Sequence, residues 1–98
     1  PQQFAAAVPA AQARTMAATQ RPIKSSALAE LAGAPAWKSL PSWGIYGAVD
    51  LNVPPAALAW MAERAHARKT VVVPGASHVV MVSHPHEVAA LIEQAAAD

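Results

Sequence analysis

Two stretches of the chain decide its fold, and each is a short apolar run closed by glycine or proline. They are Trp43-Gly44-Ile45-Tyr46-Gly47-Ala48-Val49-Asp50 and Thr70-Val71-Val72-Val73-Pro74-Gly75-Ala76-Ser77-His78. Aromatic and β-branched residues favour strands, so the sequence predicts strands over 43–47 and 70–73. The second run lacks polar alternation, which is typical of a strand covered on both faces in a parallel sheet. An acid, Asp50, follows the first strand, and a histidine, His78, follows the second.

Two segments have the periodicity of helices, one between the two predicted strands and one after the second strand. After Pro54-Pro55, apolar residues recur at the i, i+3, i+4, i+7 spacing of one helix face, in Leu58, Met61, Ala62 and Ala65. A loop is predicted over 75–84. Pro85 then suits a first helical turn, and the same spacing returns in Val88, Leu91, Ile92 and Ala95. The order strand, helix, strand, helix predicts an α/β fold in which a right-handed helical crossover joins two parallel strands.

The residues before Pro41 predict two helices and an irregular connection. An alanine-rich stretch with Pro9 near its start indicates a helix over about 9–20. A capping serine followed by two leucines indicates a shorter helix over 25–31. Glycine and proline residues between 33 and 42 predict an irregular path into the first strand.

Composition and charge narrow the classes of function. Seven Lys plus Arg against six Asp plus Glu leave a formal charge of +1 without a basic cluster, so no nucleic-acid partner is expected. The lack of cysteine excludes disulfides and thiolate metal sites. Although 54% of the residues are hydrophobic, no run reaches the roughly 18 apolar residues of a membrane span. We therefore expect no membrane partner, and the cytoplasm is the favoured compartment.

Asp50 and His78 form the candidate catalytic pair. The carboxyl ends of parallel strands meet at one edge of a sheet, and neighbouring strands lie about 4.8 Å apart. We therefore expect the Asp50 carboxylate to reach Nδ1 of His78, fix the imidazole tautomer and leave Nε2 facing a nucleophile. These are the acid and the general base of a nucleophilic hydrolase. The chain contains no Gly-x-Ser-x-Gly turn that could supply the nucleophile.

Ser77 is a poor candidate for that nucleophile. Val79 stands where a nucleophile turn has its second glycine, and the side chains of neighbouring residues usually diverge, so His78 could not easily take the Ser77 proton. The other serines are better interpreted as caps and turns.

The segments Pro41–Asp50, Met61–Arg64 and Gly75–Pro85 resemble small bacterial serine hydrolases of the α/β-hydrolase fold superfamily. The resemblance spans about 41–96, and it is loose before Pro41. It implies that residues 41–98 are the C-terminal strand-helix-strand-helix portion of a doubly wound, mostly parallel sheet. Residues 1–40 would be the end of the cap or lid helices and the connection to that portion.

The resemblance also implies roles for the two site residues. Asp50 would be the triad acid and His78 the general base of a hydrolase acting on ester, amide or related acyl substrates. The nucleophile and the oxyanion hole would then lie in an N-terminal part of the same protein, outside the 98 residues. No cofactor is expected, and the expected ligand is a small acyl substrate.

The predicted sheet is too small to stand alone. Two apolar strands need helices on both faces and further strands at their edges, and 98 residues are too few for a doubly wound sheet. We therefore expect the isolated chain to be incomplete and inactive. The N-terminal part of the same protein would complete it, or strand edges would pair in a homo-oligomer.

Other interpretations of these residues stay open. Asp50, standing before Asn52 and a Pro-Pro pair, is also a natural turn or capping residue. Small side chains between 5 and 18, with Met16 among them, either line an acyl pocket or, more commonly, pack a helix against its neighbour. A zinc site at His66, His78, His84 and His86 is a minor alternative. His84 is better explained as the cap of the last helix, His86 as a residue of its exposed first turn, and His66 as the end of the preceding helix.

Two further functions compete with acyl hydrolysis. Within the superfamily the reaction could instead be that of a cofactor-free haloperoxidase or another bond cleavage. Outside catalysis, the chain could be a binding or assembly module that keeps the acid and the histidine as relics.

Overall fold

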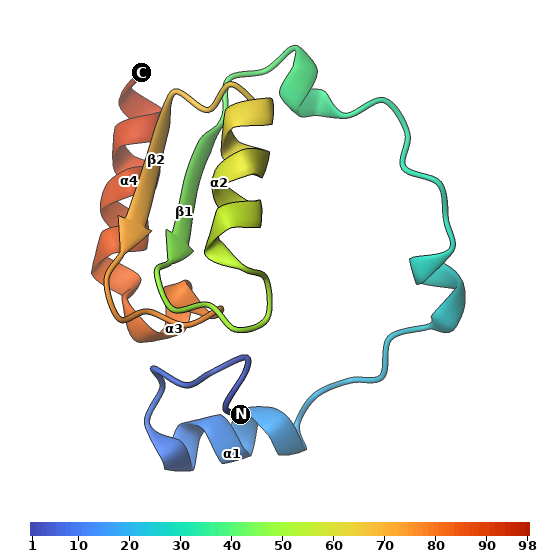
Figure 1. The fold of residues 1–98 in the computed structure, drawn as a ribbon, viewed down its shortest axis with the longest axis vertical. Coiled ribbons are helices and arrows are strands. Elements are labelled where there is room, and N and C mark those ends of the chain that lie inside the picture. Colours follow the sequence, from blue (N-terminus) through green and yellow to red (C-terminus); the bar gives the residue numbers. More distant parts are fainter.

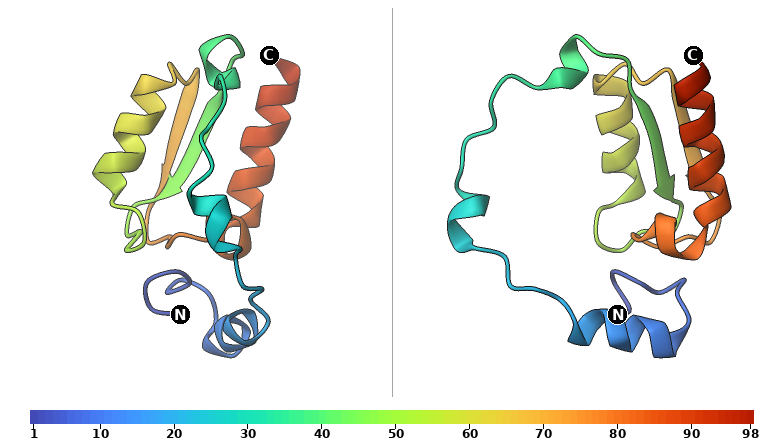
Figure 2. Two further views of the ribbon diagram at one scale, coloured as in Figure 1. Left: turned by 90° about the vertical axis from the view of Figure 1, so that its right-hand side faces the viewer. Right: turned by 180° about the vertical axis from the view of Figure 1, so that it is seen from behind.

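A strand-helix-strand-helix unit forms the centre of the structure, a computed structural model that describes all residues from Pro1 to Asp98. Strands β1 (Trp43–Gly47) and β2 (Lys69–Val73) pair in parallel. Helix α2 (Pro55–Arg64) covers one face of this sheet and helix α4 (Pro85–Ala97) covers the other (Figure 2). The predicted α/β order is therefore present, and β2 begins one residue earlier than predicted.

The register of the sheet brings the two strand ends to the same level. Trp43 pairs with Lys69, and Gly47 pairs with Val73. The loops that follow both strands therefore start side by side at one edge of the sheet, which faces the N-terminal segment (Figure 1).

Local sequence sets the ends of helix α2. Pro55 occupies the first turn, where its missing N–H costs nothing. At the other end, the N–H of Ala67 donates to the carbonyl of Ala62 (3.0 Å) and the N–H of His66 donates to that of Glu63 (2.9 Å). This is a Schellman motif, and it places His66 in the left-handed region with φ 49°.

The core consists of two small clusters. Val73, Ala76 and Val80 are buried together, with Ile45, Val71 and Val88 packed around them, and this cluster joins the sheet to α4. The second cluster unites Ala5, Val8, Ala13 and Val79, with Met16 and Val82 against it. The second cluster fastens the first residues of the chain to the loop after β2.

Helix α1 (Ala10–Ala18) lies beyond the carboxyl ends of the strands, where the sequence predicts a helix over about 9–20 (Figure 1). The prediction of an α-helix over 25–31 is wrong, because only a 3-10 turn forms at Ser25–Leu28. Its leucines have nothing to pack against, and Leu31 is 98% exposed. The long connection swings out into solvent and returns to β1 (Figures 1 and 2).

The predicted loop over 75–84 contains a short helix, α3 (Val80–Ser83). Burial of Val80 stabilises this turn, and four residues are too few to show helical periodicity in a sequence. None of the helices combines the length and the apolar character needed to cross a membrane.

Arg64 of α2 contacts the segment that leads into β1, through the ring of Trp37. Its guanidinium lies 5.2 Å from the ring centroid of Trp37 and 5.3 Å from that of Trp60. Trp60 is exposed, and its ring offers the guanidinium a cation–π contact.

Candidate active site

Gly47 allows the two loops at the strand ends to touch. A Cβ at this position would lie 2.1 Å from the carbonyl oxygen of Ala76 and 2.6 Å from that of Ser77. Only a residue without a side chain fits such a close backbone approach. The N–H of Val49 then donates to the Ala76 carbonyl at 3.2 Å, which continues the pairing beyond the end of the sheet.

Gly75 turns the second loop toward the first. Its φ of +71° is a left-handed conformation, which glycine adopts without steric cost. The residues that follow Gly75 bring the Ala76 and Ser77 carbonyls against Gly47 at the end of β1.

Asp50 and His78 meet across these loops. Nδ1 of His78 lies 2.8 Å from Oδ2 of Asp50, as the strand-end argument expects. The other carboxylate oxygen of Asp50, Oδ1, accepts hydrogen bonds from the backbone N–H groups of Asn52 (2.8 Å) and Val53 (3.0 Å). Asp50 thus closes the turn before α2 with one oxygen and holds the imidazole of His78 with the other.

The surroundings of Asp50 keep it ionised. Burial of the carboxyl, which is 4% exposed, raises its pKa. Hydrogen bonds from the Val53 N–H, the His78 ring and the Asn52 N–H more than offset that effect, so the pKa lies below its ordinary value of 3.8. An ionised Asp50 can only accept, so the hydrogen in the bond is on Nδ1 of His78, and Nε2 is left on the ring edge that faces away from Asp50.

His78 also contacts the N-terminal segment. The ring of Phe4 lies with its centroid 5.0 Å from that of the imidazole, tilted by 51°. The His78 side chain remains 29% exposed, so the ring is supported on two sides without being sealed from a reactant.

Ser77 bonds to the N-terminal segment rather than to His78. It is 1% exposed, and its Oγ accepts a hydrogen bond from the N–H of Ala7 at 3.1 Å. The structure therefore gives Ser77 a structural partner.

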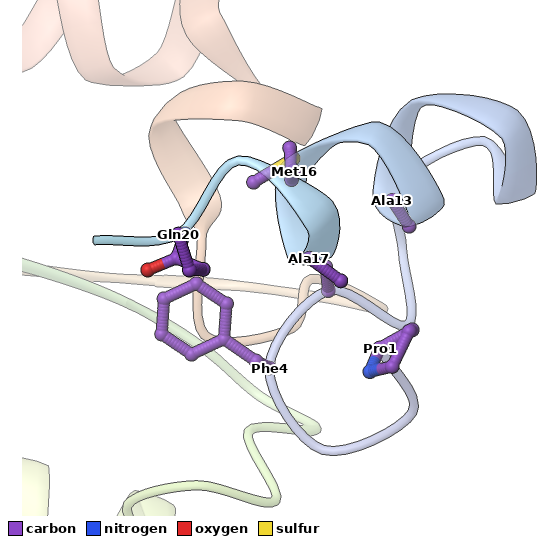
Figure 3. A pocket seen from close by; sticks show the side chains of 7 residues that line it. Pro1, Phe4, Ala13, Met16, Ala17 and Gln20 are labelled. Carbon is purple, nitrogen blue, oxygen red and sulfur yellow. The ribbon is translucent and has the colours of Figure 1, made fainter. Parts of the chain in front are cut away.

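A pocket of about 320 Å³ lies beside Phe4, between the first residues and α1 (Figure 3). Its lining is mostly apolar, with Gln20 as one polar residue, and consists of Pro1, Phe4, Ala5, Ala13, Met16, Ala17 and Gln20. Ala13 belongs to the second core cluster and Met16 packs against it, and both residues also line this pocket.

The remaining histidines are placed apart from this site. His84 is the N-cap residue of α4, as predicted, but its side chain forms no cap bond there, and its Nδ1 lies 2.8 Å from Oγ of Ser83 instead. His66 is the left-handed residue that ends α2. No three metal-ligating side chains gather anywhere in the structure.

Sequence reasoning missed the contribution of the first residues to the site. Phe4 and Ala7 contact residues seventy or more positions away. No periodicity or motif connects positions so far apart, and a lone phenylalanine in an alanine-rich stretch carries no signal of its own.

Comparison with known proteins places the chain in a family. Searches of curated proteins and of solved structures each found no match. A scan against family models matches the alpha/beta hydrolase family over residues 1–91, which includes the first forty residues as well as the strand-helix unit. With the parallel strands and the acid-histidine pair at their carboxyl ends already described, that match over most of the chain shows that the protein belongs to the alpha/beta hydrolase family.

Proposed function

We propose that this protein hydrolyses ester, amide or related acyl substrates through a Ser-His-Asp triad, with Asp50 as the acid and His78 as the general base. The observation that carries the proposal is the bond between Nδ1 of His78 and Oδ2 of Asp50, 2.8 Å long and formed at the carboxyl ends of adjacent parallel strands. Membership of the alpha/beta hydrolase family supports the same reaction class.

The geometry supports a separate role for each of the two residues, with His78 transferring protons and Asp50 stabilising the charged imidazole. Nε2 of His78 takes the proton of a serine hydroxyl as its oxygen attacks the acyl carbon, and the ionised Asp50 stabilises the imidazolium that forms. The same proton passes to the leaving group, which departs and leaves an acyl-enzyme. Water then repeats the sequence: His78 takes its proton, the acid is released and the serine regains its hydrogen.

We propose that the serine and the oxyanion hole come from a segment outside residues 1–98. Three features support the need for such a segment to complete the strand-helix unit. The sheet has only two strands, and Val72 on β2 and Ile92 on α4 are exposed apolar side chains. Only 11 of the 98 residues are buried, which is a small core for a chain of this length.

Three variants of the intact protein test the proposal against a panel of p-nitrophenyl esters. We expect Asp50→Asn to lower kcat by about 10⁴-fold, because an amide cannot stabilise the imidazolium, and His78→Ala to lower it at least as much. Glu63→Gln, an exposed acid on α2, is the matched control and should retain wild-type turnover. Turnover unchanged in Asp50→Asn would remove that residue from the triad.

A serine-directed fluorophosphonate tests the nucleophile separately. We expect covalent labelling of the intact wild-type protein and much slower labelling of His78→Ala, because the serine loses its base. An intact protein that neither labels nor turns over any ester would instead be a binding or assembly module. Labelling without ester hydrolysis would favour another reaction of the superfamily.

A further inference from the structure

Three consecutive residues of the loop after β2 each contact the N-terminal segment. Oγ of Ser77 accepts the N–H of Ala7 at 3.1 Å, and the ring of His78 lies against that of Phe4. Val79 is buried in a cluster with side chains from the same segment. The segment therefore holds this loop along its length from the side opposite the sheet (Figure 1).

The imidazole of His78 lies between two supports. The Asp50 carboxylate fixes Nδ1 at one ring edge, and the Phe4 ring rests near the imidazole at a centroid distance of 5.0 Å. A single hydrogen bond at Nδ1 leaves the ring able to tilt about that bond. A tilt moves Nε2, the atom that must face the reactant, by more than it moves Nδ1, because Nε2 lies on the far side of the ring.

We propose that Phe4 is a positioning residue for His78, and that the buried Ser77 hydroxyl anchors the segment that carries Phe4. This inference rests on the proposed function, since it assigns a purpose to contacts around the general base. Phe4 limits the tilt of the imidazole and keeps Nε2 directed at the nucleophile. Ser77 acts on His78 indirectly, because its hydrogen bond to Ala7 sets the position of the segment that carries Phe4.

The chemistry explains why a ring suits this position. A phenyl group fills the space beside the imidazole without offering a hydrogen bond, so it cannot compete with Asp50 for Nδ1 or occupy Nε2. Phe4 is 39% exposed and also lines the apolar pocket (Figure 3). A shortened side chain at position 4 therefore removes the support without opening the core.

The first test compares Phe4→Ala, Phe4→Tyr and Gln3→Ala in the intact protein with a small ester whose hydrolysis the wild type catalyses. Misplacement of a catalytic group by about 1 Å costs about 100-fold, so we expect Phe4→Ala to lower kcat by about 10- to 100-fold with KM changed less than about threefold. Phe4→Tyr keeps the ring and should recover kcat to within about threefold of the wild type. Gln3→Ala is the neighbouring exposed control and should behave as the wild type.

A second test measures the ring itself. The ¹⁵N shifts of histidine-labelled protein report which imidazole nitrogen carries hydrogen. Because the tilt retains the Nδ1 bond to Asp50, we expect His78 to keep hydrogen on Nδ1 in both the wild type and Phe4→Ala, while the thermal melting temperature of Phe4→Ala stays near that of Gln3→Ala. Loss of hydrogen from Nδ1 in Phe4→Ala, or an unchanged kcat, would overturn the positioning role.

A double-variant cycle tests the anchor. If Ser77 acts through Phe4, Ser77→Ala lowers kcat, and the double variant with Phe4→Ala loses no more than Phe4→Ala alone. Losses that multiply would overturn the anchoring role. A wild type without hydrolytic activity would count against the proposed function, whereas an active wild type with an unaffected Phe4→Ala variant would count against this inference alone.

Discussion

Substitution of Gly47 by alanine should damage both the stability and the site of this protein. The new Cβ would lie 2.1 Å from the Ala76 carbonyl oxygen and 2.6 Å from the carbonyl oxygen of Ser77. Both neighbours are backbone atoms, so no side-chain rotation can relieve the clash. The Ala76 oxygen must retreat from 2.1 Å to at least 3.4 Å, a movement of about 1.3 Å.

That movement gives the size of both effects. Overpacking lowers the free energy of unfolding by about 1–3 kcal/mol. Because the clash is with rigid backbone, we expect Gly47→Ala to lower it by about 3 kcal/mol. Because the displaced loop carries His78, the 2.8 Å bond between Nδ1 and Oδ2 of Asp50 would stretch beyond hydrogen-bond range if His78 followed the loop. A displacement of this order lowers turnover by about 100-fold.

Two of the other glycines, Gly33 and Gly75, are internal controls. Nothing lies within 4 Å of a Cβ at Gly33, so Gly33→Ala should leave the free energy of unfolding unchanged or raise it by about 0.4–1 kcal/mol. Gly75 also has open space, but its φ of +71° makes Gly75→Ala cost about 1–2 kcal/mol. Urea unfolding followed by circular dichroism measures all three. If Gly47→Ala unfolds at the same urea concentration as Gly33→Ala, the close approach of the two loops is not a feature of the folded protein.

Three further outcomes follow from the same structure. The lowered pKa of Asp50 means that its ionised form contributes stability above about pH 4 and that this contribution is lost as the pH falls through the folded-state pKa, below 3.8. The free energy of unfolding of the wild type should therefore fall more steeply than that of Asp50→Asn between pH 5 and pH 2, measured by urea titration, and parallel curves would contradict the assigned bonds. His66 ends α2 at φ 49°, so His66→Gly should raise the free energy of unfolding by about 0.5–1 kcal/mol, whereas a decrease would argue against the left-handed end. Dialysis against a chelator should leave the melting temperature and turnover unchanged, because no three ligating side chains gather, and a loss restored by zinc would show that the histidines bind metal.

Strong local signals made much of the strand-helix unit predictable. Aromatic and β-branched runs located β1 and β2, and the prolines at positions 55 and 85 located the starts of α2 and α4. The contact between Asp50 and His78 also followed from sequence, because parallel strands in register carry their loops to a common edge. Their catalytic roles stay a prediction.

Elements that depend on distant packing were not predictable. The leucines at 28 and 31 have helical spacing, but their segment meets no apolar surface, so only a 3-10 turn forms. In contrast, Val80 lies in a β-branched run that favours a strand, yet burial against the sheet makes it part of α3. Propensity reflects only the nearest few residues. Here the lack of tertiary contacts prevented an α-helix at 25–31, and the presence of such contacts favoured one at Val80.

The two oxygens of Asp50 have a consequence for how relatives of this protein should be judged. One oxygen closes the turn into α2 and the other orients the imidazole, so under the proposed function a lineage that lost catalysis would still need the aspartate for folding. His78 forms no backbone bond through its ring and keeps a partly exposed side chain. Among descendants of such an enzyme, loss of the histidine would therefore indicate loss of activity more reliably than loss of the aspartate. A retained aspartate would indicate only that the loop before α2 is retained.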